Sequence, residues 1–292
     1  MLPSRVMRLA CLLLLLLQTP EDFGHIESQT EGKIGISAEV VETGATLDFH
    51  GSSRFPMQSV YKFPIGMATL QLVDQGRLNL DTPIRVRKSD LVGGRQHSPI
   101  RDMHPDGGCS MPLREILRYA VSESDGSASD VLLRLIGGAS TVQSMLTKLG
   151  IRGVHVMDTE KAIGSDNQVQ YRNWAQPAEM VRLLKLLQQG KGLSPASRTL
   201  LLKWMTDTPT GMKRLKGNLP PGTVVAHKTG TSNTVNGVTA ATNDVGLITL
   251  PNGQHLAIAV FVADSRLSQD TRERAIAACA KIAWQHFTSE KR

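Results

Sequence analysis

Apolar and polar residues follow two different periods along this chain. Alternation with a period of two predicts β-strands within residues 33–50, and three further strands are predicted over 223–232, 240–250 and 254–264. The first stretch holds two strands joined at a Gly-containing turn, and Pro-Asn-Gly at 251–253 predicts a tight hairpin between the last two strands. Because strands occur near both ends, we expect them to pair in one antiparallel sheet.

Through the middle of the chain and again near its end, apolar residues recur every three or four positions, which predicts helices. Several of these segments end in glycine, a frequent helix terminator. The predicted helices are 63–76, 112–121, 127–137, 140–150, 176–190, 194–207 and 268–287. The expected fold class is therefore α/β (α+β): an antiparallel sheet with flanking helices plus an all-helical lobe.

One long segment of the helical region, residues 156–174, is polar and aperiodic. Loops of that length inside compact domains are usually functional or disordered.

Near the N-terminus, an apolar run from Leu9 to Leu17 follows a short basic start. It is too short to span a bilayer and matches a secretory signal, so we expect residues 1–22 to be a signal peptide. The mature protein is then periplasmic or secreted, with no membrane attachment after leader removal.

The composition narrows the possible functions. Of the 292 residues, 40% are hydrophobic and 20% are charged, an ordinary globular balance. The formal net charge of +7 comes without a basic block or interleaved aromatic residues, so we expect no nucleic-acid binding. Three cysteines exclude a disulfide-dense scaffold, and Cys109 and Cys279 could pair or stay free. The histidines lack metal-site spacing, so no metal is expected.

The segment MQSVYKFPIGM, residues 57–67, places Ser59 three residues before Lys62. If Ser59 begins a helix, the two share one face, and the ammonium lies beside the hydroxyl near the helix N-terminus. That arrangement would activate a serine and stabilise an oxyanion. Alone, however, such a pair is more often a capping serine beside a solvated lysine.

Two further motifs follow in order: Ser-Asp-Gly at 124–126 between predicted helices, and Lys-Thr-Gly at 228–230 on a predicted strand. Ser-x-x-Lys, Ser-Asp-Asn and Lys-Thr-Gly are the ordered signature of class A β-lactamases and penicillin-binding proteins. Across nearly all of its mature length the chain resembles class A serine β-lactamases. The stretches MQSVYKFPI, DNQVQYRNW and VVAHKTGTS look most like the PER-type extended-spectrum branch.

The resemblance implies hydrolysis of the β-lactam ring of penicillins and cephalosporins through a serine acyl-enzyme, giving antibiotic resistance. Ser59 would be the nucleophile, with Lys62 as proton acceptor or part of a shared proton network. Ser124 would pass a proton to the departing nitrogen. Glu160, in the polar loop, would activate the water for deacylation, the alternative being a solvated loop carboxylate.

The resemblance also assigns substrate contacts. Backbone N–H groups of Ser59 and Thr231 would form the oxyanion hole. Arg214 would be a second carboxylate-binding guanidinium or, equally, a surface cation. Gly230 would allow close backbone approach, since a side chain there would crowd the ligand. The full set of expected substrate-binding residues is Gly126, Arg214, Lys228, Thr229, Gly230, Thr231 and Ser232.

Two lobes with the active site between them are implied as well. We expect an α/β lobe from residues 23–58 and 215–292, and an all-helical lobe from 59–214 with the active-site loop 156–174. The implied architecture is β-lactamase/transpeptidase-like, and the implied partner is a small-molecule β-lactam. No cofactor is implied, and a monomer is expected.

The chain departs from the family pattern at positions beside the reaction. Gly126 replaces the usual Asn of the second motif, and Gly164 stands where relatives have Asn or His next to the hydrolytic water. Either main-chain groups or another loop side chain must replace that contact, or deacylation is slow. We favour slow deacylation, with burst kinetics and a gain in steady rate from Gly164→Asn.

Other departures affect the loop and the cleft mouth. Asp158 and Asn173 stand where many relatives have an Arg and Asp ion pair, so the loop must be held in another way. His97 replaces a frequent aromatic residue, and Gln58 and Ser232 stand where the carbapenemase branch has a cysteine pair.

Two rival functions remain open. A penicillin-binding D,D-peptidase or sensor would be acylated without efficient turnover and would have no use for Glu160. A non-catalytic secreted binding protein on the same fold would make Ser59 and Lys228 incidental.

Overall fold

The structure, a computed structural model, describes residues 19–289. Residues 1–18, most of the predicted signal peptide, lie outside the described residues, and residues 19–22 form the first turn of helix α2 (Thr19–Ser28). Within the described range, no helix combines the length and apolarity needed to cross a membrane. Of the cysteines in that range, Cys109 and Cys279 are both free, which settles the choice that the sequence left open.

The main sheet has six strands in the order β2-β1-β11-β10-β8, with the short β9 paired to β10. All of its pairings are antiparallel, and β1 meets β11 in the register Lys33↔Ala263. The prediction of one sheet built from both ends of the chain is confirmed. The strands are β1 (Lys33–Val40), β2 (Thr46–Phe49), β8 (Val225–Thr231), β9 (Thr234–Val235), β10 (Val238–Thr249) and β11 (His255–Ser265).

Every helix predicted from the pattern is present within a few residues of its expected bounds. These helices are α3 (Lys62–Asp74), α5 (Leu113–Val121), α6 (Gly126–Ile136), α7 (Ala139–Lys148), α9 (Pro177–Gln188), α10 (Pro195–Thr206) and α11 (Gln269–Ser289). The elements that the pattern did not reveal are mostly too short to show a period. They are α2, α4 (Pro99–Met103), α8 (Glu160–Ser165), β3 (Phe55–Pro56), β4 (Pro83–Arg85), β5 (Ser110–Pro112), β6 (Val154–His155), β7 (Trp174–Ala175), and the 3₁₀ turns η1 (Gln58–Tyr61), η2 (Lys88–Asp90) and η3 (Val169–Arg172).

Both faces of the sheet are covered, as β11 shows. Its even-numbered residues from Leu256 to Val262 pack in a cluster with α2 and α11, where Phe23 is fully buried. Its odd-numbered residues from Ala257 to Ala263 belong to a second cluster that continues into the helical region. Successive side chains of a strand point to opposite faces, so a strand buried on both faces has a continuous apolar run.

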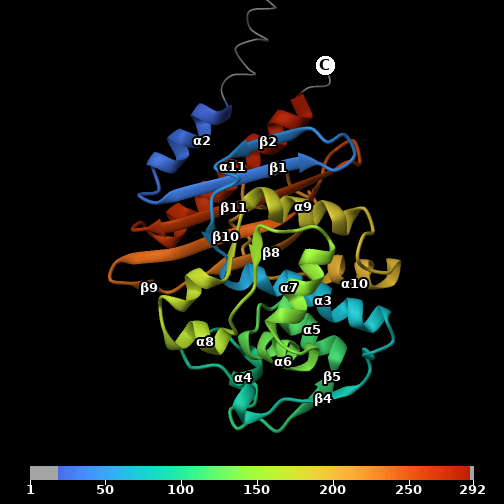
Figure 1. Ribbon diagram of the computed structural model, residues 1–292. Helices are drawn as coiled ribbons and strands as arrows, with labels where there is room; N and C mark the ends of the chain where they lie inside the picture. The colour runs from blue at the N-terminus through green and yellow to red at the C-terminus, as the bar shows by residue number, and fades with distance from the viewer. Residues whose placement is uncertain (1–18, 290–292) are drawn as a thin grey trace, which may run out of the picture.

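Figure 1 shows α2 and α11 on one side of the sheet, α9 on the other, and α3 to α8 gathered beyond α9. Helix α9 packs against β1, β10 and β11. By sequence, α9 belongs to residues 59–214, which we assign to the helical lobe, yet it packs on the sheet of the α/β lobe. It joins the two lobes through the hydrophobic cluster that they share. The lobe boundaries stay a prediction.

The base of the polar loop is held by the buried Asn173. Its Oδ1 accepts hydrogen bonds from the backbone N–H groups of Met157 and Asp158, at 2.7 and 2.9 Å, and its Nδ2 donates to Asp158 O at 2.9 Å. Asn173 O accepts from Met57 N at 2.8 Å, next to the predicted nucleophile. Asp158 also pairs with Arg172 at 3.2 Å. These contacts therefore hold the loop in place of the Arg and Asp ion pair that many relatives have at positions 158 and 173.

We expect Asn173→Ala to lower the free energy of unfolding by about 2 kcal/mol, because it leaves two part-buried backbone donors without their protein acceptor. Urea unfolding followed by circular dichroism measures this difference. Asn218→Ala, at an exposed asparagine between α10 and β8, serves as the control. Equal stability of the two variants would show that water replaces the Asn173 contacts without cost.

Candidate active site

The predicted nucleophile lies on a strained turn. Ser59 is in η1, which leads directly into α3, so it begins a helix as expected, with a tighter first turn. Gln58 before it has φ = 46°, and Ser124 has φ = 60°, both in the left-handed region that non-glycine residues rarely adopt. Such strain costs of order 1–3 kcal/mol per residue and persists where the surrounding structure imposes it, often at functional sites.

Lys62 is the cation at the centre of the site. Its side chain is only 1% exposed, which excludes the solvated lysine considered from the sequence. Its Nζ donates to Ser59 Oγ at 2.9 Å and to Ser124 O at 2.7 Å, and lies 2.9 Å from Glu160 Oε1. The i, i+3 spacing therefore does bring ammonium and hydroxyl together.

Glu160 is the carboxylate of the site, and it is buried at the start of α8, not solvated in a loop. Burial acts to raise the pKa of Glu160, but the charge and hydrogen bond of Lys62 together with Gln96 lower it below its usual value. Asp130, on α6, accepts from the backbone N–H groups of Glu160 and Lys161 at 2.8 and 3.0 Å, which fixes the first turn of α8. Burial raises the pKa of Asp130 to about 7.

A second buried lysine faces the first from the strand side. Lys228 Nζ, on β8, donates to Ser124 Oγ at 2.8 Å and to Thr229 O at 3.0 Å. Burial, followed by the charge of Lys62, holds the pKa of Lys228 well below that of a free lysine. Ser124 thus connects the two cations, with its carbonyl on Lys62 and its hydroxyl on Lys228.

Packing requires glycine at one of the two motif positions, Gly230, and only narrows the space at the other, Gly126. A Cβ on Gly230 would collide with Met57 O and lie 3.1 Å from Val60 N, so β8 can approach the nucleophile turn only with glycine. From the sequence we expect a side chain at residue 230 to crowd the ligand. In the structure it would instead collide with the backbone of the nucleophile turn. Gly126 does not line the pocket: a Cβ there would lie 3.2 Å from His97 O and 3.4 Å from Glu160 Cγ.

Arg214 is buried, so the surface alternative for this residue is wrong. Its Nε pairs with Glu273 Oε1 at 3.1 Å, and its Nη2 donates to Thr231 Oγ1 at 2.7 Å. Nη1 donates to Gly230 O and Asn243 O at 3.2 and 2.9 Å. The guanidinium therefore supports the end of β8 and places positive charge behind Thr231.

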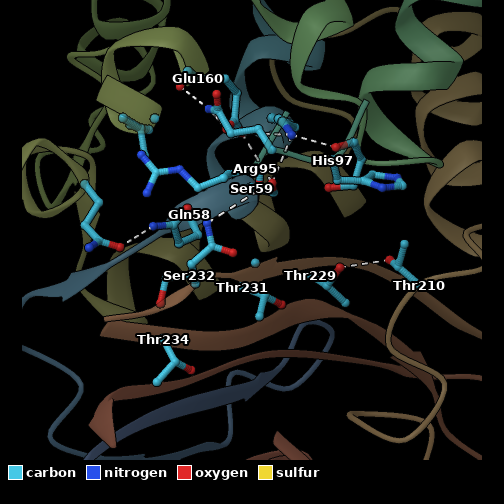
Figure 2. Close-up of a pocket in the computed structure, with 18 of the residues that line it drawn as sticks. Gln58, Ser59, Arg95, His97, Glu160, Thr210, Thr229, Thr231, Ser232 and Thr234 are labelled. Atoms are coloured by element: carbon cyan, nitrogen blue, oxygen red, sulfur yellow. Dashed lines mark hydrogen bonds and ion pairs between the residues drawn. The ribbon is translucent and has the colours of Figure 1, made fainter. Parts of the chain in front are cut away.

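These side chains surround a pocket of about 600 Å³. Figure 2 shows Thr229, Thr231 and Ser232 along the strand wall, with Ser59 across from them and Glu160 beyond it. All expected site residues except Gly126 and Lys228 line the pocket, and Lys228 is fully buried with its Nζ on Ser124 Oγ. It is also lined by polar residues that the sequence did not single out, which are Arg95, Gln96, Ser165, Asn167, Gln170, Thr210, Asn233, Thr234, Gln269 and Glu273.

Thr210 and Gln170 illustrate what the motifs missed. Thr210 Oγ1 is 2.8 Å from Thr229 Oγ1 and orients the hydroxyl of the third motif. Gln170 Oε1 accepts from Gln58 Nε2 at 2.5 Å and ties the loop to the nucleophile turn. Thr210 lies in a segment without a recognisable motif. Gln170 lies in DNQVQYRNW, a stretch that indicated the family but gave no role to this glutamine.

Comparisons with known proteins agree with this geometry. A family model described as the beta-lactamase enzyme family matches residues 20–287. The beta-lactamase VEB-1 of Pseudomonas aeruginosa is 42% identical over 260 residues, which cover 88% of this chain and 86% of VEB-1. The extended-spectrum beta-lactamase PER-1 of the same organism is 41% identical over 271 residues, which cover 92% of this chain and 88% of PER-1.

Solved structures extend the similarity to the whole fold. The crystal structure of a class A beta-lactamase from Bacteroides cellulosilyticus superimposes with a TM-score of 0.85 at 32% identity. The alignment covers 93% of this chain and 99% of that one. The resemblance inferred from three short motifs is therefore confirmed over nearly the full described length, and the chain belongs to class A of the beta-lactamase enzyme family.

Proposed function

We propose that the protein opens the β-lactam ring of penicillins and cephalosporins through an acyl-enzyme on Ser59. One observation carries this proposal: Lys62 Nζ lies 2.9 Å from both Ser59 Oγ and Glu160 Oε1. A single buried ammonium thus contacts the nucleophile and the carboxylate needed for hydrolysis. The names of VEB-1 and PER-1 support the same activity, and ring opening gives resistance to the antibiotic.

Acylation starts with attack of Ser59 Oγ on the lactam carbonyl carbon. The hydroxyl proton passes to the shared network of Lys62 and Glu160 as the new bond forms. The ring C–N bond then breaks, and the nitrogen takes a proton from Ser124 Oγ, which Lys228 contacts at 2.8 Å. Ser124 regains a proton from the network that received the Ser59 proton, which restores the protonation state of the site before deacylation. The backbone N–H groups of Ser59 and Thr231 stabilise the developing oxyanion.

Deacylation consumes one water. Glu160 takes a proton from the water as the water oxygen attacks the ester carbon. The bond between Ser59 Oγ and the acyl carbon then breaks, and the proton returns to Oγ. The low pKa of Glu160 keeps the carboxylate ionised and able to act as a base at neutral pH. The product is the ring-opened acid, and the free enzyme is regenerated.

The substrate carboxylate binds at the strand wall. Lys228 and the hydroxyls of Thr229 and Thr231 supply charge and donors there, and Arg214 acts through Thr231 Oγ1 at 2.7 Å. We place Gly230 and Ser232 in the same wall, beside the ligand. The mature protein is proposed to act as an exported monomer, periplasmic or secreted.

Incubation with benzylpenicillin, followed by product assay and intact mass measurement, tests this function. A β-lactamase gives product with a transient adduct on Ser59. A D,D-peptidase or sensor gives a persistent adduct with little product, and a non-catalytic binding protein gives neither. The burial of Glu160 beside Lys62 favours the first outcome.

The lowered pKa of Lys228 predicts a pH dependence. Binding of the substrate carboxylate needs the protonated lysine, so kcat/KM should fall as pH rises through a pKa well below that of a free lysine. In Lys228→Arg the charge persists, because a guanidinium stays protonated, and the alkaline limb should move to higher pH. A pH profile of kcat/KM measures both. An unchanged alkaline limb in Lys228→Arg would assign that limb to another group.

A further inference from the structure

The space beside Glu160 that relatives fill with a side chain at position 164 is filled here from a different segment. Glu160 and Gly164 are four residues apart on α8 and therefore share a face. A Cβ built on Gly164 would collide with Gln96 Oε1 and lie 2.5 Å from Gln96 Cδ and 2.9 Å from its Nε2. The amide of Gln96 thus occupies the volume that Gly164 leaves free.

Gln96 is oriented by the turn that carries it. Its Oε1 accepts from Gly93 N at 3.3 Å, and its backbone N–H donates to Gly93 O at 3.0 Å. Arg101 Nη1 clamps the same turn by donating to Gly93 O at 2.6 Å and Gln96 O at 2.7 Å. With Oε1 engaged by an N–H group, Nε2 is left to face oxygen acceptors.

Those acceptors belong to Glu160. Gln96 Nε2 contacts Glu160 O and lies 3.3 Å from Glu160 Oε2. The other carboxylate oxygen, Oε1, lies 2.9 Å from Lys62 Nζ and 3.4 Å from Ser59 Oγ. Each oxygen of the carboxylate therefore has its own donor, and the plane of the carboxylate is set from two sides.

We propose that Gln96 is a positioning residue for deacylation, supplying from another segment an amide beside Glu160 where Gly164 has no side chain. It acts by holding Glu160 in the orientation that activates water, and this inference rests on the proposed function. Misplacement of a catalytic group by about 1 Å can cost roughly 10²-fold in rate. Acylation depends on the Lys62 and Ser59 contacts and is affected less.

The position of the Gln96 amide changes what is expected of a side chain at residue 164. From the sequence, Gly164 favours slow deacylation and a gain from Gly164→Asn. With the Gln96 amide in that volume, an asparagine at 164 must displace it, so Gly164→Asn alone should bring no gain in steady rate.

The first test is pre-steady-state kinetics of Gln96→Ala with benzylpenicillin. We expect the steady rate to fall by about 10- to 100-fold while the burst rate stays nearly unchanged, with an acyl adduct visible by mass. Gln71→Ala is the matched control, since Gln71 is also half-buried and donates to a backbone carbonyl, Gly192 O, outside the pocket. Thermal unfolding of both variants separates loss of fold from loss of positioning.

The second test is rescue. In Gln96→Ala/Gly164→Asn the collision is gone and an amide again lies next to Glu160, so the steady rate should recover most of the loss seen in Gln96→Ala. A merely structural role of Gln96 would not be rescued from position 164. Normal turnover by Gln96→Ala, or a double variant no faster than Gln96→Ala, overturns the inference and leaves the proposed function standing. A wild-type protein that forms neither adduct nor product removes the proposed function, and this inference with it.

Discussion

Ser59→Ala should abolish β-lactam hydrolysis, with kcat lower by roughly 10⁴- to 10⁶-fold, because the variant lacks the oxygen that attacks the lactam and cannot form the acyl-enzyme. The fold should be unaffected, since the change removes one oxygen. Steady-state hydrolysis of a chromogenic cephalosporin measures the loss, and intact mass should show no adduct. The wild-type contact from Lys62 Nζ to Ser59 Oγ, 2.9 Å long, is the interaction removed.

Ser53→Ala provides the control, because Ser53 is an exposed serine a few residues upstream. It should hydrolyse the substrate at the wild-type rate and unfold at the wild-type temperature. Substantial turnover by Ser59→Ala would mean that another group carries the acyl chain or that water attacks the lactam directly. Either result would rule out the serine mechanism.

Glu160→Gln should accumulate the acyl-enzyme. Loss of a general base commonly costs about 10²- to 10⁴-fold, and here the loss should fall on deacylation, so a burst of one equivalent precedes slow turnover. The glutamine keeps the size of the side chain and can still accept from Lys62. Intact mass measured during turnover should show the penicillin adduct, and Glu115→Gln on α5 should turn over as the wild type does.

The pH profile of deacylation gives an independent check on the same residue. Burial works to raise the pKa of Glu160, but Lys62 and Gln96 lower it further than burial raises it. Deacylation should therefore persist at pH values where an ordinary glutamate is half protonated, and fall only below them. Normal turnover by Glu160→Gln, or failure to acylate at all, would assign the water activation elsewhere.

The fold was predictable because its main elements are long. The helices over 112–121 and 176–190 repeat their apolar spacing over several turns, and the strands of the hairpin around 251–253 are long segments joined by a recognisable turn. Short elements such as β3 and β7 have only two residues each, so no period exists to detect. Helix α8 escaped detection for a related reason, since one and a half turns rich in polar and small residues look like a loop.

The site was predictable only where a motif marked it. Ser59, Lys62 and Lys228 belong to short patterns with a known order. Gln96, in contrast, contacts Glu160, 64 residues further along the chain, and Asn173 contacts Asp158, 15 residues before it. A single sequence contains no signal that pairs Gln96 with Glu160, because the pairing depends on how two loops meet in space. The polar loop could be identified as functional from the sequence, but Gln96, whose amide contacts Glu160 in that loop, could not.

The pairing of β1 with β11 also constrains the order in which the molecule can assemble. A ribosome makes β1 first among the sheet strands and β11 last, yet Lys33 to Val40 lie directly against Leu256 to Ala263. The central pair of the sheet must therefore wait until nearly the whole chain has been synthesised, and closing so long a loop costs entropy before any contact rewards it. The turn that carries the serine is complete in sequence long before the strand that supports it exists, so catalytic competence arrives only with the final strands.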